Sequence, residues 1–371
     1  MPVASAGGSH GAVVLVAPAS WIGRVAPASP FQREFLRTLQ VQCSLGGLRP
    51  LKACYSVGRG ESVRITTEEG RPFDPAMLNV RILGAIVWTA GDEDRCREAV
   101  GSMRPWQCPV AVLDETGTIP DRAAVPARFY PVAWTPSPSM LLGRYLRESG
   151  HRRAAFISPF YGALWSKNRF AGLCDGIGDG AVVPCTDSRY IHLQDLYRAL
   201  KGWQRRDESD FLRTGSVNRY EPSRRHLRSY KERKLDLGMA EALEAHVVPL
   251  LDKALTTGAT VWVADSDRCA VIALDYCASR GIRVPRDLSV AGFDNTVDAA
   301  VNDLTSVDFN VQAYAGTMLA FLLRRETAPA GQENSGEIAS FVIERGSTAA
   351  IRTRAVASDE GARNRKKRSV S

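Results

Sequence analysis

Several features that would place this chain in a membrane or export class are missing from its 371 residues. No stretch approaches the ~20 consecutive apolar residues that a membrane-spanning helix needs. No charged region precedes the short apolar segment near the N-terminus, so a secretory signal peptide is not expected. These absences predict a cytoplasmic protein that makes no contact with a membrane.

The 8 cysteines lack the spacing of a metal site or of a redox motif, because no two of them form a CxxC pair. The spacing of Cys174, Cys185 and His192 also fits no usual zinc-ligand pattern. Several cysteines lie in apolar sequence, which is typical of buried and reduced thiols in a cytosolic protein. We therefore expect no bound metal.

Signatures of catalysis are also missing. The sequence contains no GxSxG motif, no Ser–His–Asp signature and no P-loop. Gly176, Gly178 and Gly180 follow an expected helix, so they are turn glycines and not a dinucleotide-binding fingerprint. The sequence accordingly predicts a protein that is not an enzyme and that holds no cofactor.

What is present is an ordinary globular composition, with 44% hydrophobic and 24% charged residues. The length is sufficient for two domains or lobes. The net charge of +8 favours contact with polyanions, although net charge alone does not identify a nucleic-acid-binding protein.

The most informative stretch is residues 261–295, which predicts a β-α-β unit. An apolar strand at 261–264 precedes a polar turn and a helix at 268–280, and Gly281 is suited to end that helix. The next strand, at 288–291, leads into Asp294 and Asn295. Polar residues therefore follow both strands, at the edge where ligands bind in open parallel α/β sheets.

Four motifs in this chain resemble the effector-binding domain of the lactose/galactose repressor family. The run from Gly281 to Asn295 reads GIRVPRDLSVAGFDN, and residues 149–157 read SGHRRAAFI. Residues 169–173 read RFAGL, and residues 344–348 read ERGST. Their order and rough spacing agree with the family over about 140–350, which makes the resemblance specific for the fold.

The resemblance implies an α/β fold of the type I periplasmic-binding-protein kind, with two lobes and three crossovers between them. Each lobe is expected to be a parallel sheet flanked by helices. The first lobe is expected to span 12–130 plus about 305–323. The second is expected to span 131–300 plus about 335–352, with a charged insert at 201–234. Residues 1–11 are expected to be a flexible N-terminus, and 356–371 a disordered basic tail.

Expected elements of the first lobe are strands at 12–17, 48–55, 80–88 and 110–113, and helices at 31–45 and 93–103. Residues 56–75 are expected to be irregular, and the proline-rich segment 114–138 to lead into the second lobe. A helix is expected to begin near Ser139, followed by a strand at 154–158.

Three charged residues are predicted to bind a small polar ligand such as a sugar. Arg169 can donate a planar fork of hydrogen bonds, and its alternative role is a surface salt bridge. Asp294 can accept from ligand hydroxyls, cap the following helix, or do both. For Asp267, ligand binding and capping of the helix that begins at Arg268 are equally favoured.

Two tryptophans and one serine complete the predicted ligand site. Trp134 stands where the family commonly has an aspartate, and an indole ring can stack on the face of a sugar but cannot accept a hydrogen bond. Trp165 is either a second stacking platform or a partly buried loop aromatic. Ser20 follows the first strand and is placed at the cleft by topology alone.

Regulators of this family carry a DNA-binding headpiece before the first strand, whereas the first strand here is expected at Ala12. Three explanations stay open. The chain is the sensor part of a longer protein, it acts without a headpiece through partners, or the basic stretches at 201–234 and 363–368 bind DNA without sequence preference. Solvated surface is the alternative role of both stretches.

The resemblance thus implies the sugar-sensing domain of a transcriptional regulator, in which ligand-dependent lobe closure controls DNA binding or a partner. A homodimer is expected. The alternative is a solute-binding protein of a sugar transport system, because that class shares the fold and differs in location.

Overall fold

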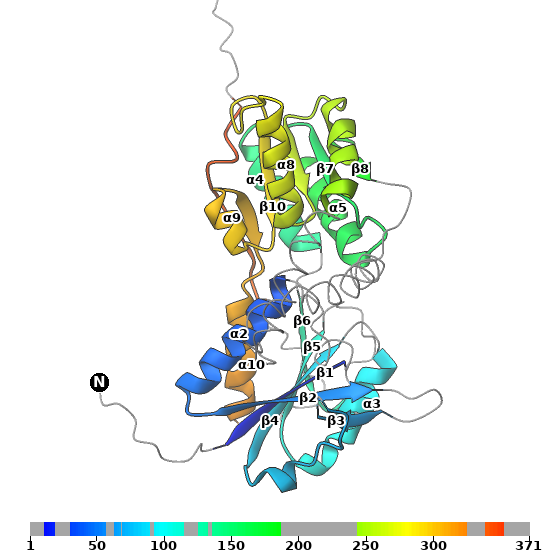
Figure 1. The fold of residues 1–371 in the computed structure, drawn as a ribbon, viewed down its shortest axis with the longest axis vertical. Helices are drawn as coiled ribbons and strands as arrows, with labels where there is room; N and C mark the ends of the chain where they lie inside the picture. The colour runs from blue at the N-terminus through cyan, green and yellow to red at the C-terminus, as the bar shows by residue number, and fades with distance from the viewer. Residues whose placement is uncertain are drawn as a thin grey trace, which may run out of the picture.

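The computed structural model forms two lobes, one above the other in the view of Figure 1. Each lobe is built around one six-stranded sheet. The residues that the structure describes are 11–18, 30–56, 63–67, 69–89, 93–114, 125–132, 136–186, 243–324 and 338–351. The predicted flexible N-terminus, the charged insert at 201–234 and the basic tail lie outside these ranges, apart from Gly11.

The sheet of the first lobe has the strand order β3-β2-β1-β4-β5-β6. Its central strand β1 pairs in parallel with both β2 and β4, while the edge strand β3 pairs antiparallel with β2. The strands are β1 (Ala12–Pro18), β2 (Arg49–Ser56), β3 (Arg64–Thr66), β4 (Ile82–Thr89), β5 (Val110–Asp114) and β6 (Arg128–Pro131).

Helices cover both faces of this first sheet because its buried strands are apolar on both sides. In β1, Leu15 faces a core shared with α2 (Pro30–Leu45) and α10 (Val311–Arg324). Its neighbour Val16 faces a second core shared with α3 (Glu93–Ser102). Short 3-10 turns, η1 (Pro75–Leu78) and η2 (Arg104–Trp106), complete the lobe.

The sheet of the second lobe has the strand order β12-β11-β10-β9-β7-β8. All neighbouring strands pair in parallel except the edge strand β12, which is antiparallel to β11. The strands are β7 (Ala154–Ser158), β8 (Val182–Thr186), β9 (Val261–Ala264), β10 (Ser289–Phe293), β11 (Thr305–Asp308) and β12 (Phe341–Ile343).

The second sheet is also covered on both faces. Phe156 of β7 packs with α4 (Pro136–Glu148) and α5 (Leu164–Ile177), whereas Ile157 packs with α8 (Asp267–Ser279) and with the helical residues 243–255. Gly143 of α4 and Gly176 of α5 allow the closest approach of these two helices, because a Cβ on Gly143 would lie 2.8 Å from the Cα of Gly176. A short helix, α9 (Val297–Val301), follows β10.

The α/β two-lobed fold predicted from the sequence is confirmed, with four corrections. Each sheet is mixed, since β3 and β12 are antiparallel edge strands. Residues 56–75 contain the strand β3, and the segment 114–138 contains β6. The strand β8 was not expected, because Pro184 within it is unusual for a strand. Residues 305–308 form β11 of the second sheet and not part of the first lobe.

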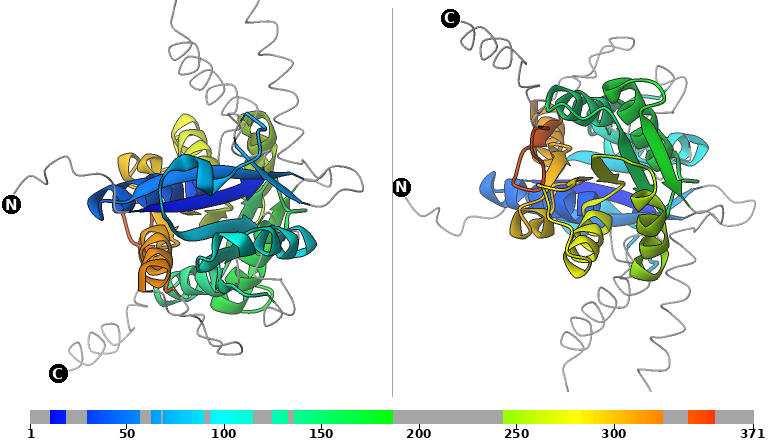
Figure 2. Two further views of the ribbon diagram at one scale, coloured as in Figure 1. Left: turned by 90° about the horizontal axis from the view of Figure 1, so that it is seen from below. Right: turned by 90° about the horizontal axis from the view of Figure 1, so that it is seen from above.

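Among the described residues that follow β11, the helix α10 is the element that returns to the first lobe. It packs against α2 and β4, and Figure 2 shows it in orange beside the blue strands of that lobe. The connection between β11 and α10 is short and consists of Phe309 and Asn310, of which Phe309 is buried. Phe309 belongs to an apolar core that continues from one lobe into the other.

Candidate functional site

Polar side chains gather where the parallel strands of the second sheet end. Ser158 is the last residue of β7, Asp265 follows β9 and Asp294 follows β10. These three strands are mostly apolar and are buried over their whole length, and polar side chains stand at the point where each of them ends. The order of strands reverses between β7 and β9, and such a reversal is where ligands bind in open α/β sheets.

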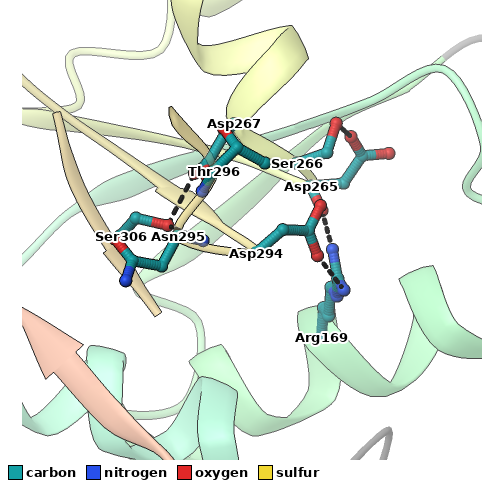
Figure 3. A network of polar contacts seen from close by, with 8 residues as sticks. All are labelled: Arg169, Asp265, Ser266, Asp267, Asp294, Asn295, Thr296 and Ser306. Atoms are coloured by element: carbon teal, nitrogen blue, oxygen red, sulfur yellow. Dashed lines mark hydrogen bonds and ion pairs between the residues drawn. The ribbon is translucent and has the colours of Figure 1, made fainter. Parts of the chain in front are cut away.

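Arg169 of α5 reaches this edge and is buried there. Its Nη2 donates to Oδ1 of Asp294 at 2.9 Å, and its Nη1 donates to the backbone carbonyl of Asp265 (Figure 3). Only 4% of the Arg169 side chain and 9% of the Asp294 side chain are exposed. The alternative of a solvated surface salt bridge is therefore wrong, and the pair is a buried ion pair.

Three aromatic rings surround the guanidinium of Arg169. Its Cζ lies 5.0 Å from the ring centroid of Trp165 and 4.9 Å from the centroids of both Phe293 and Phe309. Such contacts stabilise a cation through the negative face of each ring. The guanidinium therefore touches α5, the end of β10 and the connection into α10.

Asp294 and Asn295 lie in the left-handed region of the backbone, with φ of 102° and 44°. Aspartate and asparagine are the residues other than glycine that tolerate this region best. Asp294 does not cap the helix that follows it. Thr296 caps α9 instead, since its side chain accepts from the backbone N–H of Ala299. The capping role considered for Asp294 is wrong.

Asp267 uses both carboxylate oxygens within the protein. Its Oδ2 accepts from the backbone N–H of Thr296 at 2.7 Å, and its Oδ1 accepts from the hydroxyl of Ser306 at 2.6 Å (Figure 3). The side chain is fully buried. Asp267 is the first residue of α8 and Ser266 is its N-cap, so capping of α8 is not the role of this carboxylate. It holds the loop 294–296 in place.

A second buried carboxylate, Asp265, accepts from Ser158 Oγ at 2.5 Å and from Ser266 Oγ at 3.2 Å. Ser158 also contacts Ser166 of α5 at 2.7 Å and accepts from the backbone N–H of Phe160. This network joins the ends of β7 and β9 to α5. Neither Ser158 nor Ser166 was predicted, because serine is too common for its position alone to identify it.

Burial dominates the electrostatics of the three carboxyl groups. Loss of hydration raises the pKa of Asp265 to about 6, against the hydrogen bond from Ser158 and the charge of Arg169. Burial and then the neighbouring Asp294 raise the pKa of Asp267. Burial also raises the pKa of Asp294, while Arg169 opposes that rise. The cluster thus holds negative charge at a cost in free energy, as binding sites commonly do.

Of the two tryptophans and the serine predicted for the ligand site, the structure describes only Trp165. Trp165 lies in the first turn of α5, and not in a loop, with its ring centroid 5.9 Å from that of Phe160. It is half-buried and lies beside Arg169. Ser20 and Trp134 lie outside the described residues.

The first sheet also ends in buried polar residues, which sequence reasoning missed. Thr89 is the last residue of β4 and Asp114 is the last residue of β5, and both are fully buried. The hydroxyl of Thr89 donates to the backbone carbonyl of Leu113 at 3.3 Å. The sequence VAVLD carried the same signal that identified Asp294, an aspartate directly after an apolar strand.

Metal-binding and membrane-spanning features are absent from the part of the chain that the structure describes. Within those residues, no group of three or more His, Cys, Asp or Glu side chains is arranged to hold a metal ion. None of the helices there combines the length and the apolar character that crossing a bilayer demands.

The chain has two lobes, each with a mostly parallel sheet, and polar side chains stand at the ends of the strands. These features define the class of two-lobed α/β proteins with the periplasmic-binding-protein fold. A family model described as periplasmic binding protein-like domain matches residues 144–348, more than half of the chain. The chain belongs to this family. No curated protein sequence matches it.

Several solved structures with a similar fold carry the names of transcriptional regulators. The Escherichia coli transcriptional repressor ascG superposes with a TM-score of 0.57 at 16% identity, covering 92% of this chain and 100% of its own. A LacI transcriptional regulator from a Rhodococcus species gives 0.52 at 17%, covering 92% and 98%. A LacI family regulator from Enterococcus faecium with bound ribose gives 0.53 at 14%, covering 92% and 99%. At these identities the likeness establishes the fold.

Proposed function

We propose that this chain is the ligand-sensing domain of a transcriptional regulator and that it binds a sugar or sugar derivative between its lobes. The observation that carries the proposal is the buried Arg169–Asp294 ion pair, which lies at the strand ends and against the connection between the lobes. The comparisons also support the proposal, because structures with a similar fold are named as transcriptional regulators and one of them holds bound ribose.

In this proposal, each site residue has a defined role. Asp294 accepts from ligand hydroxyls, and Arg169 donates to the ligand while holding Asp294. Trp165 covers one face of the ligand ring. Asp267 is buried with both oxygens occupied, so it acts on the ligand through the loop 294–296.

Three further residues complete the proposed site. Asp114 supplies a carboxylate from the strand ends of the first lobe. Ser20, on the ground of topology, and Trp134, on the ground of the family resemblance, are proposed as further ligand contacts, and both lie outside the described residues. We propose no catalysed reaction for this site, because the proposed roles of its residues are those of binding and not of proton or group transfer.

The mechanism follows from linkage between binding and lobe arrangement. A ligand that contacts both lobes binds more tightly to the closed arrangement than to the open one, and it shifts the population accordingly. A homodimer then passes the change to DNA or to a partner protein. The DNA contact comes from a headpiece in a longer chain or from the basic insert at 201–234.

The test is a calorimetric titration with ribose, other pentoses, hexoses and disaccharides. We expect one sugar to bind, and Asp294→Asn to weaken its binding by about tenfold to a hundredfold, because a charge-assisted hydrogen bond is lost. The matched control is Asp287→Asn, since Asp287 also pairs with an arginine, Arg283, but on the exposed surface.

Two results would contradict the proposal in different ways. If no sugar binds at millimolar concentration, the ligand class is wrong. If a sugar binds equally well to wild type and to Asp294→Asn, the site is wrong. The alternative of a solute-binding protein for transport is separated by location, because that class works outside the cytoplasm.

A further inference from the structure

Side chains tie the loop after β10 to the connection that leads out of the second lobe. The Nδ2 of Asn295 donates to Oδ2 of Asp308 at 2.8 Å, and its backbone N–H donates to the hydroxyl of Ser306 at 3.0 Å. Asp308 is the last residue of β11 and directly precedes Phe309 and Asn310, which enter the first lobe. A residue adjacent to Asp294 is therefore bonded to the start of the crossover.

The same chain of contacts continues through the crossover. The second oxygen of Asp308, Oδ1, accepts from the backbone N–H of Asn310 at 2.6 Å. The Nδ2 of Asn310 then donates to the carbonyl of Ala339 at 3.1 Å, in the segment that leads back into β12. Asn310 also lies in the left-handed region, with φ of 54°. Two connections between the lobes are thus joined by one asparagine.

Arg345 fixes the direction of this network. Its Nη2 donates to Oδ1 of Asn295 at 2.6 Å, and its Nη1 donates to the carbonyl of Leu304 at 2.7 Å. Because an arginine can only donate, the oxygen of the Asn295 amide must face Arg345 and its NH2 group must face Asp308. No other orientation of the Asn295 amide satisfies both partners.

We propose that Asn295 is a positioning residue that transmits the state of the Arg169–Asp294 ion pair to the crossover, through Asp308 and Asn310. Asp294 and Asn295 are consecutive, and both hold left-handed backbone conformations, which persist only where surrounding contacts impose them. Arg169 contacts the same crossover through the ring of Phe309. The site therefore meets the crossover at two consecutive residues, Asp308 through Asn295 and Phe309 through Arg169.

This inference deepens the proposed function, since a ligand at Asp294 would act on lobe closure through Asn295. Two roles of Asn295, a structural one and a transmitting one, lead to different behaviour of the crossover. A merely structural Asn295 would stiffen the crossover whatever the state of Asp294. A transmitting Asn295 makes the crossover respond to Asp294.

The test is hydrogen–deuterium exchange of the whole chain without ligand, read at the backbone amide of Asn310 and in residues 338–341. Asn295→Gly removes the side chain but keeps the left-handed backbone, which glycine adopts freely. We expect it to raise exchange at these amides by about tenfold. The matched control is Asn79→Gly, an exposed asparagine of the first lobe with φ of 47°, which should leave them unchanged.

A double-mutant cycle decides between the two roles. Asp294→Asn should raise exchange at the crossover by about fivefold in the wild-type background and by less than about twofold in the Asn295→Gly background. If its effect is the same in both backgrounds, Asn295 does not transmit and the inference is wrong. If Asn295→Gly fails to fold, Asn310→Gly breaks the next bond of the network and the same cycle applies.

Failure of this inference and failure of the proposed function give different results. The exchange cycle uses no ligand, so its outcome does not depend on finding a sugar. Sugar binding that is weakened by Asp294→Asn, together with independent exchange effects, would keep the binding site and remove the transmission.

Discussion

The two lobes have the same architecture but differ in what lies at the ends of their strands. In the second lobe, Arg169 bonds to both Asp265 and Asp294 in a buried cluster, and Asp267 is buried beside them and bonds to the loop that follows Asp294. In the first, the described strand ends carry Thr89 and Asp114, which are both buried and lie opposite each other in the register of β4 and β5. The family model begins at residue 144 and so matches the second lobe, with the returning helix α10, and not the first sheet.

The difference shows what makes a fold recognisable from its sequence. The first sheet is held by apolar contacts, and many combinations of Val, Leu, Ile and Ala can fill such a core. The second lobe needs particular polar residues, because each buried donor or acceptor requires a partner. Recognisable motifs therefore concentrate where charge is buried.

Among the variants that test this difference between the lobes, Arg169→Met is expected to have the largest effect on the free energy of unfolding. Removing the guanidinium leaves the buried carboxylate of Asp294 without its cation, so we expect a loss of about 3–5 kcal/mol in the free energy of unfolding, measured in urea. Adding Asp294→Leu should restore part of that loss, because the uncompensated charge is then removed. Equal stability of the single and double variants would show that the ion pair is not what is lost.

Close packing should also differ between the lobes. A Cβ on Gly176 of α5 would lie 2.5 Å from the backbone oxygen of Met140, which cannot move without shifting α4. A Cβ on Gly84 of β4 would lie 2.8 Å from Cβ of Leu322, which is fixed to its backbone, so the single helix α10 would have to shift to make room.

We therefore expect Gly176→Ala to cost about 3 kcal/mol and Gly84→Ala about 1 kcal/mol. Thermal unfolding of both variants beside wild type measures the difference. The reverse order would mean that α4 and α5 separate more easily than α10 adjusts.

The buried carboxyl of Asp265 predicts a pH dependence peculiar to the second lobe. Its pKa of about 6 in the folded protein exceeds the ordinary value of about 3.9 in the unfolded chain, so the folded state binds the proton more tightly. Its contribution to stability is complete below about pH 4 and is lost as the pH rises through about 6.

The stability of wild type relative to Asp265→Asn should therefore fall by roughly 2 kcal/mol between pH 4 and pH 7, measured by urea unfolding. Asp287→Asn is the control and should give a nearly flat profile over this range, because hydrogen bonds from Arg283 lower the pKa of Asp287 to about 2. A flat profile for Asp265→Asn would mean that the carboxyl is already ionised in the fold at pH 4.

The smallest effect is expected for the removal of a buried hydroxyl group at a strand end of each sheet. Ser158→Ala removes a donor to the Asp265 carboxylate and an acceptor for the Phe160 amide, and should cost about 2 kcal/mol. Thr89→Val removes one bond to a carbonyl in the first lobe and should cost about 0.5–1 kcal/mol. Equal costs in chemical denaturation would remove the energetic contrast between the lobes.

Much of the fold followed from local sequence signals. The apolar runs and Gly281 predicted β9, α8 and β10 to within a few residues, because strand and helix periods are local properties. β3 and β8 were missed because one is short and polar and the other contains a proline. Assignment of β11 to the second sheet depends on which strand pairs with which, and strand pairing is not a local property.

The candidate site was predictable residue by residue but not as an arrangement. Asp294 and Arg169 were identified by motifs, whereas their direct contact across 125 positions requires the strand order to be known. The capping roles considered for Asp267 and Asp294 failed because Ser266 and Thr296 occupy the capping positions. Asp114 was missed although the rule that selected Asp294 applied to it equally.

The return of α10 to the first lobe has a consequence for protein synthesis. Every strand of the first sheet has been synthesised once residue 131 is added to the chain, but one face of that sheet stays without α10 until residue 324 has been added. Domains generally fold in the order in which they are translated. Here the lobe made first cannot be completed until nearly the whole of the second has been translated, so the two lobes should become stable together.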